Sequence, residues 1–141
     1  MNDDTRHQDS GQVTAFAIVM VSALILVTGL VLDGGLILSA RVRAIGEAQE
    51  AARAGAQAID LQVYRTRGDV VLNLPQASAA ARAYLSATGA SGDVQVSPAR
   101  VMVTVHRTQP TQILNVIGLG AVQVRATASA RAARGITTEI P

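Results

Sequence analysis

Residues 12–32 read QVTAFAIVMVSALILVTGLVL, and this stretch decides the architecture of the 141-residue chain. None of its side chains carries a charge. At about 1.5 Å per residue, a helix of this length spans the roughly 30 Å hydrocarbon layer of a bilayer. A buried core helix is the alternative, but so small a chain has too little else to cover all its faces. The sequence therefore predicts a transmembrane helix.

A cleaved signal peptide is the other interpretation of this segment, with the cut after Ala40. The apolar run is longer than the usual h-region of about 7 to 15 residues, and residues 1–11, MNDDTRHQDSG, hold more acid than base. We therefore expect a retained anchor preceded by residues 1–11 as a leader. The positive-inside rule, which counts Arg6 against Arg41 and Arg43, favours a cytoplasmic C-terminus.

Asp33, Gly34 and Gly35 follow the apolar run at once and mark the expected membrane exit. Two interpretations are open. In the first, the helix breaks at the interface and Asp33 caps the next helix, with the glycines as flexible residues. In the second, the Asp33 carboxylate pairs with an Arg of a neighbouring subunit.

An extended helix is predicted outside the membrane over residues 33–64, because apolar side chains recur there at spacings near 3.6. The side expected to be buried carries Val42, Ile45, Ala52, Ala56, Ile59 and Val63. Small residues spaced by four allow another helix to approach closely. This helix-packing face comprises Ala44, Ala48, Ala51, Ala52, Gly55 and Ala56. It contacts either neighbouring helices of an assembly or the protein's own globular part.

A small domain is predicted over residues 65–131, beginning with a turn at 65–69 and a short strand at 70–72. Pro75 then opens a helix that runs to about Ser86. Beyond this helix the apolar period changes to two, which is typical of β-strands. Two strands form a hairpin that turns at residues 97–99, and a third runs from Val122 to Ala130. The hairpin's apolar side carries Val94, Val96, Val101, Val103 and Val105.

Residues 113–120, ILNVIGLG, separate the second and third strands and are too short to span a membrane. We expect a helical turn that closes the sheet, with a membrane-dipping loop as the alternative. The predicted fold is α+β: a long N-terminal transmembrane helix extended beyond the membrane, then a three- to four-stranded, mostly antiparallel sheet with one or two short helices. Residues 132–141 lack periodicity and are expected to form a flexible tail.

The sequence holds little that indicates chemistry. The chain has no Cys, which excludes disulfides and thiolate catalysis, and His7 and His106 lack the spacing of metal ligands. Glu47 and Glu50 lie one turn apart near arginines, so we expect a solvated face rather than an acid/base pair. No phosphate-binding loop or nucleophile elbow is present. We therefore expect no enzyme, no cofactor, no metal and no evident small-molecule substrate.

Charge also limits the possible partners. The formal net charge is only +2 and the arginines are scattered along the chain. A nucleic-acid binder would concentrate basic residues on one surface. We therefore expect no nucleic acid as a partner.

The N-terminal residues resemble a known family. The features that carry the resemblance are Ser10 to Val13, the apolar run, Leu32 to Gly35, and the alanines and glycine at 44–56. Over about residues 9 to 60 they are similar to the N-terminal module of Flp pilus-assembly proteins, the TadE/TadG-like group of tight-adherence systems. The resemblance implies a bacterial, single-pass cell-membrane protein with residues 1–11 as a cytoplasmic leader and an extracellular C-terminal domain.

The same resemblance implies a non-enzymatic minor pilin or pseudopilin of a Tad/Flp-type pilus or related secretion apparatus. Its partners would be other pilus or pseudopilus subunits and platform proteins of the assembly machinery. Prepilin-type processing would cut after Gly11 and leave Gln12 as the new N-terminus. Such families carry a Glu five residues past the cut, where this chain has Phe16. The alternative function is a membrane-tethered binding or sensing module with an unknown ligand.

Overall fold

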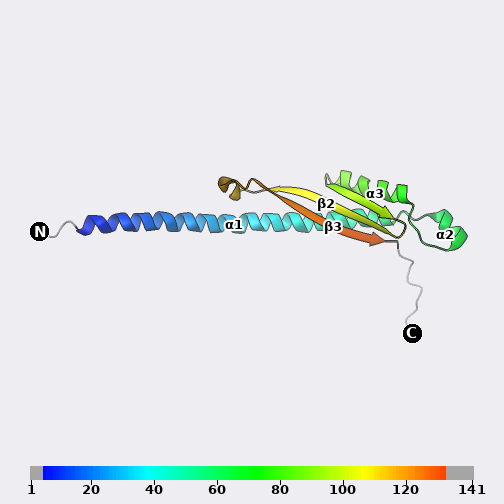
Figure 1. Ribbon diagram of the computed structural model, residues 1–141, viewed down its shortest axis with the longest axis horizontal. Coiled ribbons are helices and arrows are strands. Elements are labelled where there is room, and N and C mark those ends of the chain that lie inside the picture. The colour runs from blue at the N-terminus through cyan, green and yellow to red at the C-terminus, as the bar shows by residue number, and fades with distance from the viewer. Residues whose placement is uncertain (1–4, 133–141) are drawn as a thin grey trace, which may run out of the picture. The chain divides into compact units, whose positions relative to one another are not determined.

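The computed structural model describes residues 5–132, and the α+β fold expected from the sequence is confirmed (Figure 1). Its helices are α1 (Thr5–Ala56), α2 (Leu61–Arg67), α3 (Leu74–Ala87) and the 3₁₀ helix η1 (Leu114–Ile117), and its strands are β1 (Ser91–Ser97), β2 (Arg100–Pro110) and β3 (Ala121–Arg131). Residues 1–4 of the expected leader and 133–141 of the expected tail lie outside the described residues.

The described chain forms two compact units. Unit 1 comprises the start of α1, up to Ile37, together with residues 110–122. Unit 2 comprises residues 38–109 and the chain from Gln123 onward, and so holds the end of α1, both short α-helices and most of the sheet. The division places the apolar run in unit 1.

The sheet of three strands has the order β1-β2-β3, with β2 in the centre. β1 and β2 pair antiparallel in the register Val94↔Val103 and Ser97↔Arg100, so the hairpin turns where the sequence predicts. Val101, Val103 and Val105 are fully buried, and Val124 and Ala126 of β3 are nearly so. The alternation of apolar and polar residues therefore gives the sheet one buried and one exposed face.

α1 runs without a break through Asp33, Gly34 and Gly35, so the predicted interfacial break is wrong. A glycine in a helix interior costs only about 1 kcal/mol relative to Ala, which a long helix tolerates. Asp33 also does not cap a new helix, because its carboxylate binds backbone amides of residues 112–114. The chain therefore leaves the apolar run without a break in the helix.

The first long helix ends at Ala56, not at Tyr64 as predicted. Asp60 starts a separate helix there: its backbone is extended and its side chain accepts hydrogen bonds from the amides of Gln62 and Val63. α2 thus occupies much of the predicted turn at 65–69. The predicted strand at 70–72 is reduced to a single bridge between Leu72 and Ile59.

The helix from Pro75 is confirmed as α3. Asn73 is its N-cap, with the side chain accepting a hydrogen bond from the amide of Gln76, and the proline stands in the first turn. Its buried side chains are Ala77, Ala81 and Leu85, and α3 contacts β1. This helix therefore completes the core of unit 2.

In unit 2, the side of α1 that faces inward is the predicted helix-packing face, and it shares only Ala52 and the half-buried Ala56 with the side predicted from the apolar spacing. Val42 is 63% exposed and Ile45 39%, whereas the fully buried positions are Ala44, Ala48, Ala51 and Ala52. Gly55 is buried as well, and a Cβ there would lie 2.9 Å from the carbonyl oxygen of Ala77 and 3.0 Å from Val101 Cγ1. Side-chain size decides the outcome, because only small residues let α3 and the sheet approach this closely.

Candidate functional site

The apolar part of α1 lies uncovered by the rest of its unit. Every residue from Gln12 to Thr28 is exposed, on all sides of the helix. Among the residues that the structure describes, one helix is long and apolar enough to cross a membrane, over Gln12–Ala56. A surface that faces water does not carry so continuous an apolar area. Such an area is typical of a helix that is surrounded by lipid.

Asp33 is fully buried in unit 1 and forms the most specific contact of this part of the chain. Its Oδ1 accepts the amide of Gln112 at 2.8 Å, and its Oδ2 accepts the amides of Ile113 at 3.0 Å and Leu114 at 2.7 Å. These amides stand at the start of η1, where unpaired backbone donors favour an anion. Both oxygens are thus used within the chain, which does not favour the predicted pairing with a neighbour's Arg.

Gly29, one helical turn before Asp33, is the second contact point and was not singled out from the sequence. A Cβ at Gly29 would overlap the side chain of Ile113, with 2.8 Å to its Cβ. A glycine four residues before a carboxylate at the end of an apolar run is the signal that could have identified it. Residues 111–120, which we call the finger, thus contact α1 at Gly29 and Asp33.

Many backbone groups of the finger form hydrogen bonds within the finger itself. The amide of Thr111 donates to the carbonyl of Gly120, and its hydroxyl donates to the carbonyl of Leu119. The amides of Val116 and Leu119 donate to the carbonyls of Ile113 and Leu114. Meanwhile the apolar side chains at its tip point outward: Val116 is 85% exposed and Leu119 is 54% exposed.

In unit 2, Glu47 and Arg107 form a bidentate ion pair. The Nε–H of Arg107 donates to Oε2 at 2.8 Å, and an η-nitrogen donates to Oε1. The two side chains are 12% and 28% exposed, and the hydrogen bond raises the pKa of Arg107. The expectation that Glu47 lies on a solvated face is therefore wrong, whereas Glu50 does lie exposed, paired with Arg53.

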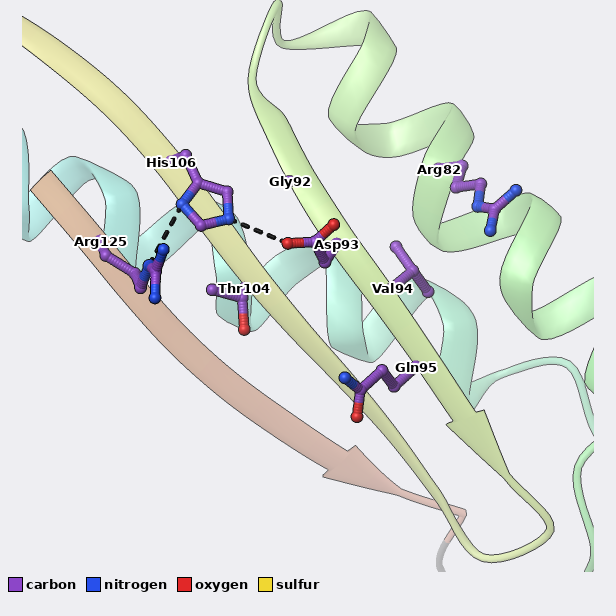
Figure 2. Close-up of a pocket in the computed structure, with 8 residues that line it drawn as sticks. All are labelled: Arg82, Gly92, Asp93, Val94, Gln95, Thr104, His106 and Arg125. Carbon is purple, nitrogen blue, oxygen red and sulfur yellow. Dashed lines mark hydrogen bonds and ion pairs between the residues drawn. The ribbon is translucent and has the colours of Figure 1, made fainter. Parts of the chain in front are cut away.

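The exposed face of the sheet carries a polar groove (Figure 2). His106 on β2 lies 3.0 Å from Asp93 on β1 through Nε2, and its Nδ1 accepts a hydrogen bond from Arg125 of β3 at 3.3 Å. Because Nδ1 accepts, Nε2 carries the proton and donates to Asp93. Arg82 of α3 borders the groove. Within the described residues no group of His, Cys, Asp or Glu is arranged to hold a metal ion.

The residues of the predicted helix-packing face lie within the core of unit 2, so the structure favours the interpretation that they pack on the protein's own globular part. Ala56 is half-buried and the other members are buried. Gly11 and Gln12, the predicted processing site, both lie within α1, and Gln12 is exposed. Processing there stays a prediction.

Comparison with known families identifies the N-terminal third of the chain. Residues 11–58 match the model of the Tad family, described as Flp pilus-assembly TadE/G-like, which confirms the resemblance noted in the sequence. Comparisons with curated proteins and with solved structures gave no match. The match suggests a component associated with Flp pilus assembly, and with the apolar helix it suggests a single-pass membrane protein.

Proposed function

We propose that the chain is a non-enzymatic, membrane-anchored structural or assembly component, similar to a minor pilin or pseudopilin, of a Tad/Flp-type pilus or related secretion apparatus. The observation that carries this proposal is the uncovered apolar helix within residues 12–32, in the region that matches the family. An apolar surface on all sides of a helix is suited to lipid and to helices of other subunits, and to no soluble substrate.

The surface available for subunit packing is the outer side of α1 in unit 2. Because the alanine face is occupied, the apolar side chains left open are Leu38, Val42 and Ile45, and they follow helical spacing. Gly46 lies beside them with nothing within 4 Å of its Cβ position. We call this set the outer stripe and propose that it contacts helices of other pilus or pseudopilus subunits.

Substitution at the outer stripe tests the assembly role. Val42→Arg places a charge on an exposed position, so the fold should be kept while co-purification with the pilus components encoded alongside is lost. Gln57→Arg is the matched control, because Gln57 is exposed and lies just beyond the end of the same helix. Undiminished co-purification of the Val42→Arg chain would contradict assembly through this surface.

Topology tests the proposed extracellular location of the C-terminal domain. The chain has no Cys, so Ser91→Cys, at an exposed position, gives a single thiol for a membrane-impermeant maleimide on intact cells. We expect labelling from outside. Labelling only after lysis, with an external control thiol reacting normally, would instead favour the alternative, a cytoplasmic tethered sensing module that uses the groove near His106.

We also propose Gly11 as a prepilin-type cleavage site. The mass of the mature chain decides the outcome: a chain that begins at Gln12 indicates processing and entry into a filament. A chain that keeps residues 1–11 indicates a permanently anchored assembly factor, which fits the Phe16 found in place of the family's Glu equally well.

A further inference from the structure

The finger is attached to α1 inside the end of the apolar run. Ile113 lies against Gly29, and Gly29 precedes Leu32, the last residue of the uncharged run, by three positions. Three residues correspond to about 4.5 Å along a helix. If α1 is inserted over residues 12–32, the base of the finger therefore lies at the depth of the hydrocarbon boundary, not beyond it.

The backbone of the finger is suited to that depth. Irregular backbone is stable next to hydrocarbon only when its polar groups are satisfied within the protein. The amides of Gln112, Ile113 and Leu114 bind Asp33, and the amides of Thr111, Val116, Gly118 and Leu119 bind carbonyls of the finger. Seven amide donors between residues 111 and 119 thus have partners without water.

The side chains of the finger also suit that depth. Val116, which is 85% exposed, and Leu119, which is 54% exposed, are the most exposed of its apolar side chains for which exposure is described. The polar side chains of Gln112 and Asn115 are exposed too, and they suit the headgroup layer rather than the hydrocarbon centre. In the same unit, the apolar side chains of α1 between Gln12 and Thr28 are exposed as well.

We propose that the finger inserts into the headgroup and outer acyl layer of the same bilayer, so that Val116 and Leu119 contact lipid beside α1. This inference rests on the proposed membrane anchoring of α1 and extends it. The chain is then held at two places in the bilayer, and Asp33 satisfies the amides that would otherwise be stranded at the membrane edge. The partner is the lipid surface itself, not another protein.

Single tryptophans test the insertion, because the chain has no Trp of its own. The Val116→Trp chain is placed in phosphatidylcholine vesicles that carry bromine at shallow or deep acyl positions. Val27→Trp in the apolar run and Gln95→Trp on the exposed face of the sheet are the membrane and water controls. We expect Val116→Trp to emit at shorter wavelength than Gln95→Trp and to be quenched most by shallow bromines.

A second variant links the result to the contact with Asp33. Asp33→Ala in the Val116→Trp chain removes the acceptor of three finger amides, so quenching at Val116 should fall while quenching of Val27→Trp stays the same. Unchanged quenching at Val116 would overturn the assigned role of Asp33 in holding the finger at that depth.

Each remaining outcome is decisive. If Val116→Trp emits like Gln95→Trp and is not quenched while Val27→Trp is quenched, insertion of the finger is wrong and the membrane anchoring of α1 holds. If Val27→Trp is not quenched either, both the insertion and the anchoring are wrong. A blue shift at Val116 that vanishes when the protein is diluted in lipid, or that needs added pilus proteins, would overturn the lipid contact in favour of a protein partner.

Discussion

Two glycines of α1, Gly55 and Gly46, allow the packing of the helix on the sheet to be measured with one substitution. Gly→Ala in a helix interior gains about 1 kcal/mol of stability from backbone propensity. At Gly46 nothing lies within 4 Å of the new Cβ, so that gain should be seen in full. At Gly55 the Cβ would lie 2.9 Å from the Ala77 carbonyl oxygen and 3.0 Å from Val101 Cγ1, so overpacking opposes the gain by about 1–3 kcal/mol.

The difference between the two variants contains the packing cost together with a smaller propensity gain at Gly55, which lies one residue before the end of α1. We expect Gly55→Ala to unfold about 1–3 kcal/mol more easily than Gly46→Ala. For a domain of this size, each kcal/mol corresponds to roughly 4–8 °C in Tm. The measurement is thermal unfolding of the full chain in detergent, followed by circular dichroism. Equal melting temperatures, or a more stable Gly55→Ala chain, would refute the close approach of α1, α3 and β2.

Further predictions concern ion pairs and the membrane exit. Glu47→Ala should cost about 1–3 kcal/mol in urea unfolding, because it leaves a half-buried Arg107 unpaired, whereas Glu50→Ala should cost less than about 0.5 kcal/mol. Because folding raises the pKa of Arg107, the ion pair contributes stability at every pH below the pKa of the guanidinium in the unfolded chain. The cost of Glu47→Ala should therefore be the same at about pH 7 and pH 9, and a decline by pH 9 would contradict this. Gly34→Ala should leave the helix intact with slightly higher helicity by circular dichroism, and lost helicity would contradict an unbroken α1. Asp33→Ala should speed amide exchange at residues 112–114 by about tenfold or more in mass spectrometry, and unchanged exchange would argue against these hydrogen bonds.

The parts of the fold that follow local rules could be predicted from the sequence. An uncharged run of 21 residues and a strict alternation of Val101, Val103 and Val105 each indicate one structure, because a bilayer helix and a two-sided sheet impose those patterns directly. The hairpin turn and the helix opened by Pro75 follow in the same way. Local sequence therefore determines the type of most elements here.

The long-range contacts could not be predicted this way. Asp33 reads as a helix cap, and its true partners lie 79 to 81 residues further along the chain. Val42 and Ile45 were wrongly placed on the buried side of α1 because periodicity weighs them above alanines, whereas the space left by α3 and the sheet admits only small side chains. The end of α1 had a signal in Asp60, which the run of helical spacings obscured.

The distance in sequence between Asp33 and its donors also sets an order of events during synthesis. Residue 112 is made 79 residues after Asp33, which at roughly 5–20 residues per second is a delay of about 4–16 s. Throughout that interval the carboxylate of Asp33 lacks the three amides that later bind it. The contact between Asp33 and the finger is thus completed only after most of the chain has been made.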